Sequence, residues 1–80
     1  MNFKIKLYSP NDACMFVNKC SLFDEDIDYC VDRYIISAKS MLGVLGIPLG
    51  KIATVKIHSE DESVIRAFKE YIQLWILEEE

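Results

Sequence analysis

Apolar residues recur along this chain of 80 residues with two different periods, and the order of those periods constrains the fold more than any other feature. Apolar residues at every second position are typical of half-buried strands, and apolar residues three and four positions apart are typical of amphipathic helices. In chain order, the pattern predicts a strand over 2–8, a helix over 13–20, strands over 27–31 and 34–38, a short helix within 40–50, a strand over 52–58 and a long helix over 60–77. Three helices gathered on one face of a four-stranded, mostly antiparallel sheet form an α+β open-faced sandwich. The predicted architecture is therefore βαββαβα, in one domain spanning residues 1–80.

Two of the predicted helices carry an apolar stripe that we expect to face the core. On the first helix the stripe is Ala13, Phe16, Val17 and Cys20. On the last helix it is Val64, Ala67, Phe68, Tyr71 and Trp75. Acidic residues at 60–62 suit the positive end of the last helix, and the acidic run 78–80 is expected to fray.

Composition and charge exclude several classes of partner and site. The formal net charge is −4 and the pI about 4.9, so we expect no basic surface that would bind a nucleic acid. No apolar run approaches the about 20 residues that cross a bilayer, which predicts no membrane insertion. The three cysteines include no CxxC pair, a pattern that is typical of free thiols in the cytoplasm rather than of a disulfide framework or a zinc site. The sequence predicts no cofactor and no metal.

One segment carries a family resemblance. Lys39-Ser40-Met41-Leu42-Gly43-Val44-Leu45 resembles the region around the regulatory serine of HPr, the small phosphocarrier of the sugar phosphotransferase system. The likeness extends without a gap from about Phe16 to Ile57, and the predicted order of elements matches the HPr fold. The resemblance implies an HPr-like fold, a cytoplasmic place in the phosphotransferase system, and no enzyme activity of the chain's own.

The histidine motif of that family is absent. HPr carries its phosphoryl group on a histidine at the start of the first helix, in a His-x-Arg-Pro motif where the arginine and the helix N-terminus hold the phosphoryl oxygens. The corresponding stretch, Ser9-Pro10-Asn11-Asp12-Ala13-Cys14, is shorter and contains neither histidine nor arginine. Asp12 also places a negative charge where a phosphate would sit. These residues exclude phosphocarrier chemistry through the family histidine.

Ser40 has two compatible interpretations. Its hydroxyl is suited to capping the short helix that follows it, because a serine side chain can accept a hydrogen bond from an unpaired backbone N–H. The resemblance implies that Ser40 is also a regulatory phosphorylation site for the kinase that modifies HPr-like proteins. A phosphate at the start of a helix is electrostatically favourable.

Met41, Leu42 and Leu45 are the predicted partner-binding residues. A short helix cannot turn all of its apolar side chains inward, and Val44 is the better candidate for the core. The resemblance implies that the three matching positions form an exposed patch that docks onto other proteins. Methionine adapts well to such surfaces, and contiguous exposed apolar side chains usually mark a binding site.

The leading hypothesis is a regulatory module that carries no phosphoryl group and binds proteins through the Ser40 helix. The resemblance implies a regulatory kinase or a transcription regulator of sugar metabolism as partner. One alternative is a phosphocarrier-type protein with an atypical acceptor, either Cys14 near the first turn of a helix or His58 at a strand end. The other is a structural or orphan domain kept for assembly, for example as a homodimer.

Overall fold

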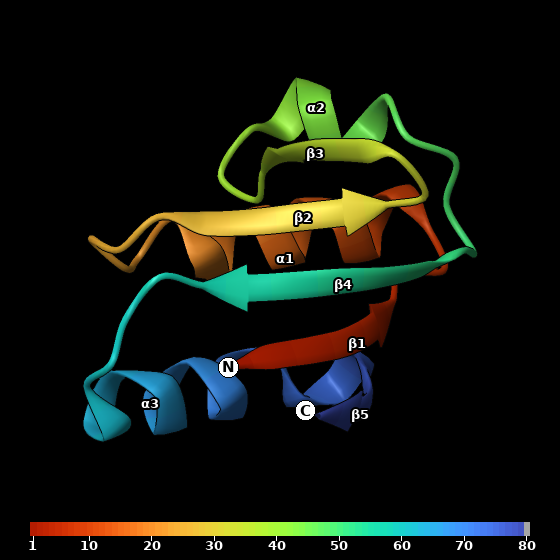
Figure 1. Cartoon of the computed structure of the whole chain (residues 1–80). Coiled ribbons are helices and arrows are strands. Elements are labelled where there is room, and N and C mark those ends of the chain that lie inside the picture. The colour runs from red at the N-terminus through yellow and green to blue at the C-terminus, as the bar shows by residue number, and fades with distance from the viewer. Residues whose placement is uncertain (80) are drawn as a thin grey trace.

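Nine secondary-structure elements make up residues 1–79, the part of the chain that the computed structural model describes (Figure 1). In chain order they are β1 (Asn2–Lys6), α1 (Pro10–Cys20), β2 (Ile27–Val31), β3 (Tyr34–Ser37), α2 (Met41–Leu45), β4 (Ile52–Ile57), α3 (Glu62–Ile72), the 3-10 turn η1 (Gln73–Trp75) and β5 (Ile76–Glu79). The strands form one antiparallel sheet in the order β3-β2-β4-β1-β5. The α+β architecture is confirmed, but the sheet has five strands where four were predicted.

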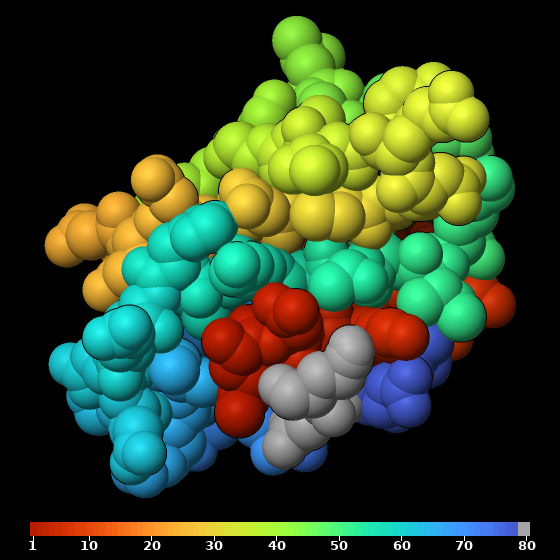
Figure 2. All heavy atoms as spheres, in the orientation of Figure 1, coloured from red at the N-terminus to blue at the C-terminus, as the bar shows by residue number. Residues whose placement is uncertain are grey.

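The helices leave one face of the sheet open. In Figure 1, α1 lies behind β2 and β4, α3 lies at the β1 end of the sheet, and α2 sits beyond the β3 edge. α1 contacts both of the other helices. Figure 2, in the same orientation, shows the face of the sheet turned away from α1, where side chains of β1, β2, β3 and β4 form the surface. The core therefore lies in one layer between the sheet and α1 with α3.

Strict alternation in β1 produces the centre of that core. Phe3, Ile5 and Leu7 are each fully buried. Phe3 lies opposite Val55 and Ile5 opposite Ala53, so β1 and β4 bury their apolar side chains on the same face. Burying each large side chain contributes about 1.5–3 kcal/mol, which explains why a period of two predicted these strands well.

The apolar stripe predicted for the first helix is confirmed. Its four side chains, Ala13, Phe16, Val17 and Cys20, are all buried. Pro10 occupies the first helical position, where a missing N–H costs nothing, and Ser9 is the N-cap. The ring of Phe16 packs edge-on against Trp75 at a centroid distance of 5.9 Å. This contact joins α1 to the turn that follows α3.

A two-residue turn at 32–33 joins β2 to β3, as predicted. Asp32 takes a left-handed backbone conformation with φ 54°, which aspartate tolerates better than most residues and which suits a tight hairpin. Its carboxylate accepts a hydrogen bond from Nζ of Lys51 at 2.9 Å, and the same contact raises the pKa of that lysine. The turn is thereby tied to the start of β4.

The prediction of a helix continuing to residue 77 is wrong. α3 ends at Ile72, and after η1 the chain forms β5 along the outer side of β1. Ile76 pairs with Ile5, and Nζ of Lys4 lies 3.6 Å from Oε1 of Glu78. Strand pairing wins because an uncovered β1 edge would leave its N–H and C=O groups without protein partners. The expected fraying fails for 78 and 79, which are strand, and position 80 lies outside the described residues.

The stripe predicted for the last helix is correct only in part. Phe68 and Trp75 are buried, and Val64 is partly buried against the core. Tyr71 is instead 43% exposed, and its expected place is taken by Ile72, which is fully buried. The spacing of four from Phe68 to Ile72 keeps both side chains on one face of α3, whereas Tyr71 turns toward solvent.

Candidate functional site

α2 is a five-residue helix held against the edge of the sheet. Its N-cap is Ser40, whose Oγ accepts a hydrogen bond from the backbone N–H of Gly43 at 3.1 Å. The Gly43 backbone lies close to β3, since a Cβ at this position would stand 2.9 Å from Cδ1 of Ile36. The short helix is thus fixed at both its cap and its back, and its remaining side chains have set directions.

Those directions divide the apolar residues of α2 between the core and the solvent. Val44 is fully buried, and Met41 is partly buried against the core. Leu42 is 86% exposed, more than any other large apolar side chain in residues 1–79, and Leu45 is 39% exposed. We refer to Met41, Leu42 and Leu45 as the α2 surface. The structure brings the three predicted partner-binding residues together on this helix, with Met41 the least accessible.

The segment of the sequence that contains α2 is basic. The segment 33–59, which holds β3, α2 and β4, contains no acidic residue, although the whole chain carries 13. Its basic residues are Arg33, Lys39, Lys51 and Lys56. Lys39 directly precedes the cap of α2, and its Nζ donates a hydrogen bond to the carbonyl of Phe23. This local excess of positive charge is visible in the sequence, but the overall charge of −4 conceals it.

The N-terminus of α1, where HPr-like proteins are expected to hold their histidine, is closed by its own side chains. Oγ of Ser9 accepts a hydrogen bond from the N–H of Asp12 at 3.1 Å. Oδ2 of Asp12 in turn accepts one from the N–H of Tyr8, also at 3.1 Å. This reciprocal arrangement is close to a capping box, and it occupies backbone donors with an anionic group.

His58 lies at the other end of the sheet. It follows the last residue of β4, six positions after Ile52, which pairs with Lys6 just before α1. At about 3.3 Å per residue, this separation is about 20 Å. The imidazole is therefore not brought to the start of α1.

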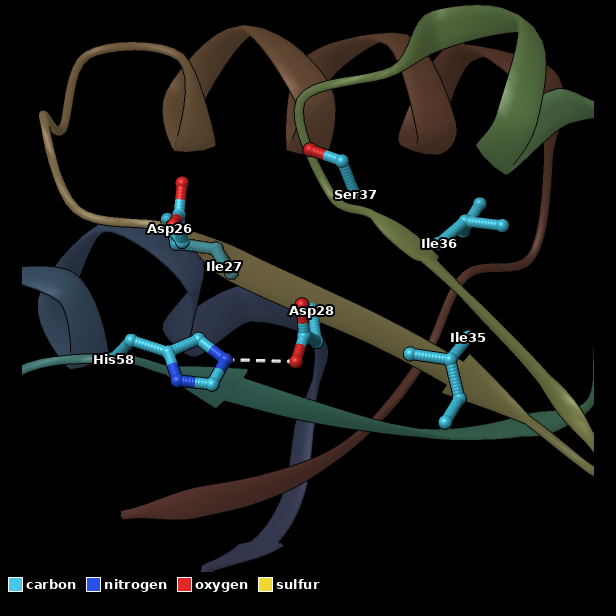
Figure 3. A pocket seen from close by; sticks show the side chains of 7 residues that line it. All are labelled: Asp26, Ile27, Asp28, Ile35, Ile36, Ser37 and His58. Atoms are coloured by element: carbon cyan, nitrogen blue, oxygen red, sulfur yellow. Dashed lines mark hydrogen bonds and ion pairs between the residues drawn. The ribbon is translucent and has the colours of Figure 1, made fainter.

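His58 instead borders a shallow hollow of about 370 Å³ on β2, β3 and β4 (Figure 3). Nε2 of His58 lies 2.7 Å from Oδ2 of Asp28, and the backbone N–H of His58 donates to the carbonyl of Asp26. Ser37 also lines the hollow, but its hydroxyl accepts a hydrogen bond from the N–H of Lys39 and points away from the imidazole. Among the side chains that line this hollow, no nucleophile contacts the imidazole.

The thiols give little support for nucleophilic chemistry. Burial raises the pKa of Cys20 to about 12, so this thiol is protonated at neutral pH. Burial and the nearby Asp28 carboxylate raise the pKa of Cys30 as well. Cys14 is a free, partly buried thiol on α1.

Neither a metal-ligating cluster nor a membrane-spanning helix occurs within residues 1–79. No three metal-ligating side chains cluster in this part of the chain. None of its helices has the length and apolar character needed for a bilayer crossing.

No protein-family model and no curated protein matches the sequence. Solved structures do resemble it. HPr-C-His from Thermoanaerobacter tengcongensis gives a TM-score of 0.70 at 22% identity, with 91% of each chain covered. The phosphocarrier protein HPr from Bacillus anthracis gives 0.65 at 23% identity, with 89% of this chain and 94% of that one covered. The chain has the HPr fold.

Another HPr-fold structure is that of the Bacillus subtilis catabolite repression containing protein Crh, which forms a swapped, intertwined dimer. Its TM-score is 0.64 at 22% identity, and the match covers 92% of this chain and 88% of that one. These structural matches establish the HPr fold, which agrees with the resemblance carried by the segment 39–45. In this HPr fold, Ser40 and the α2 surface lie on one short helix, and Cys14 and His58 lie on other elements.

Proposed function

We propose that the protein is an HPr-family member of the phosphotransferase system that carries no phosphoryl group and regulates other proteins by binding them through the α2 surface. The exposure of Leu42 is the observation that carries this proposal. A leucine that is 86% exposed, on a helix capped by Ser40 and seated on β3, exposes apolar area to water in a fixed position. A partner that covers it recovers about 25 cal/mol for each Å² of apolar surface removed from water.

The charge of the surrounding segment specifies the partner's chemistry. Lys51 is paired with Asp32, but the segment 33–59 has no carboxylate of its own, and Lys39 stands directly before the cap of α2. A partner with an apolar recess bordered by acidic residues fits this surface best, because complementary charge steers association and disfavours wrong partners. A regulatory kinase or a transcription regulator of sugar metabolism, acting in the cytoplasm, would present such a recess.

Phosphorylation of Ser40 would act as a switch on the same surface. The Ser40 side chain is exposed and accepts only the N–H of Gly43 among the described residues. A phosphoryl group adds about −1.5 to −2 charge at neutral pH and strong acceptor oxygens. It would reverse the local sign of charge beside Leu42, weaken binding to an acidic recess and favour a partner rich in arginine.

The modification is tested with the kinase that phosphorylates HPr-like proteins. Incubation with this kinase and ATP is expected to add one phosphoryl group to the intact mass of the wild-type chain. The Ser40→Ala variant is expected to remain unmodified. An unchanged wild-type mass, with an HPr control modified in the same reaction, would remove the switch from the proposal.

The binding surface is tested by titrating the ¹⁵N-labelled protein with the kinase and, separately, with the sugar-metabolism regulator. Backbone signals of residues 41–45 are expected to shift, and Leu42→Asp is expected to weaken binding at least about tenfold. Leu74→Asp is the matched control, because Leu74 is 73% exposed but lies on η1. Equal losses from both variants, or shifts confined to other elements, would show that α2 is not the docking site.

A further inference from the structure

A second exposed apolar site lies on the helical side of the molecule. The last turns of α1 and α3 border a groove of about 380 Å³, lined by Lys19, Leu22, Glu70 and Tyr71. We call it the α1–α3 groove. Leu22 is 69% exposed and Tyr71 43% exposed, so its apolar walls are open to water.

The aromatic wall of the groove is held rigidly. The Tyr71 ring packs edge-on against Phe23 at 5.3 Å, and Phe23 packs edge-on against the fully buried Phe68 at 5.4 Å. Tyr71 therefore has little freedom left to lose on binding, which is the property that makes tyrosine a good interface residue.

The two charges of the groove have opposite signs and come from different helices. Lys19 lies in the last turn of α1, with Nζ 5.5 Å from the centre of the Trp75 ring. Glu70 lies in the last turn of α3. Within residues 1–79, no ion pair joins Lys19 to Glu70, so both charges are available to a second molecule.

We propose that the α1–α3 groove is the interface of a weak symmetric homodimer. In a two-fold interface the same patch meets itself, so a residue and its contact each occur twice. A groove that supplies one cation and one anion beside two apolar residues is complementary to its own copy. Lys19 of each protomer faces Glu70 of its partner, and Leu22 and Tyr71 close over one another. A partner of a single charge sign would leave one of these charges unpaired.

The dimer is expected to be weak and to leave the α2 surface free. Stable interfaces cover about 800 Å² on each partner, more than four side chains supply, so association should be visible only toward about 1 mM chain. Figure 1 shows α2 and α3 at opposite ends of the sheet. Each dimer would then present two α2 surfaces, so a target with two sites would be bound with added avidity. The dimer itself does not rest on the proposed function, whereas the gain in avidity does.

A charge-swap experiment on the full chain tests the inference. In sedimentation velocity the wild-type mass is expected to rise from 9.3 kDa toward twice that value as concentration increases. Lys19→Glu and Glu70→Lys should each raise the dimer dissociation constant at least about tenfold, because two attractions become two repulsions. An equimolar mixture of these two variants should associate again, since both cross-pairs then join opposite charges.

Two further variants separate this interface from other modes of association. Leu22→Asp should abolish the dimer, whereas Leu42→Asp should leave it intact. Circular dichroism of each variant confirms folding. A wild-type chain that stays monomeric to about 1 mM overturns the proposal. So does a dimer that is insensitive to both charge variants, as an element-swapped dimer would be, or a mixture of the variants that fails to associate.

Discussion

The hydroxyl of Ser40 accepts a hydrogen bond from the backbone N–H of Gly43 at 3.1 Å, so the residue proposed as a modification site is also the cap of the helix that it would regulate. The Ser40 side chain therefore both stabilises α2 and carries the proposed regulation. A variant that removes the hydroxyl changes both, and the two effects have to be measured separately.

Ser40→Ala is expected to lower the free energy of unfolding by about 1 kcal/mol through loss of the cap. For a domain of this size that corresponds to a fall in Tm of about 4–8 °C. Ser40→Asp keeps an acceptor for the Gly43 N–H and should lose less. Thermal unfolding followed by circular dichroism measures both. Equal destabilisation by the two variants would mean that capping is not the stabilising contact.

Incubation with enzyme I and phosphoenolpyruvate is expected to leave the intact mass unchanged. The start of α1 holds the Asp12 carboxylate, and the chain's single imidazole lies at the far end of β4 next to Asp28. An HPr in the same reaction serves as the positive control. A phosphoryl group mapped by peptide mass spectrometry to Cys14 or His58 would restore the carrier alternative.

Trp75→Phe is expected to cost about 1 kcal/mol, compared with about 3–5 kcal/mol for Trp75→Ala. The indole N–H of Trp75 is buried and has no hydrogen-bond partner within residues 1–79, so removing it relieves a desolvation cost that partly offsets the smaller ring. Urea unfolding curves supply the two values. If Trp75→Phe lowered the free energy of unfolding as much as Trp75→Ala, the indole N–H would have to form a hydrogen bond in the native protein.

Cys20 is expected to be the last thiol alkylated by iodoacetamide at about pH 8 in the native protein. Its pKa of about 12 leaves almost no thiolate, and its side chain is fully buried. Cys14 and Cys30 are only partly buried and should react first. Peptide mapping over time gives the order, and urea should abolish the protection. Rapid labelling of Cys20 without urea would contradict the burial of the α1 stripe.

The cap of α3 is expected to weaken in acid. The side-chain and backbone hydrogen bonds from Ser63 hold the pKa of Asp61 below its usual value. A depressed pKa contributes stability that is present above the unfolded pKa and is lost as pH falls through the folded one, here below about pH 4. Asp61→Asn keeps a capping side chain without the titration. The difference in Tm between the wild-type chain and Asp61→Asn should therefore be smaller at low pH than near pH 7.

Most of the fold follows from local patterns in the sequence. The alternation of Phe3, Ile5 and Leu7, the stripe on α1 and the capping position of Ser40 each depend on neighbours a few residues away. Such patterns predict the fold well because the apolar spacing seen in the sequence is the same spacing that buries one face of a helix or strand. The α2 segment was recognised by resemblance, and periodicity alone would not have separated exposed Leu42 from buried Val44.

The wrong predictions concern segments whose structure depends on contacts with residues far away in the sequence. Residues 76–79 carry no turn signal that would separate them from the helix, and they become a strand because β1 has a free edge beside them. The shift of the buried position from Tyr71 to Ile72 follows from how α3 packs on the aromatic rings of the core. That Lys19 and the distant Glu70 line one groove likewise depends on helix packing.

The position of β1 between β4 and β5 has a consequence for biosynthesis. Phe3 pairs with Val55 on one side and with Glu79 on the other, so β1 leaves the ribosome well before either of its neighbours. Until those segments emerge, its two rows of amide groups and its phenylalanine and isoleucine side chains stay unprotected. We expect nascent chains from which β4 and β5 have not yet emerged to recruit ribosome-associated chaperones, and chains whose β4 and β5 lie outside the ribosome to fold without them.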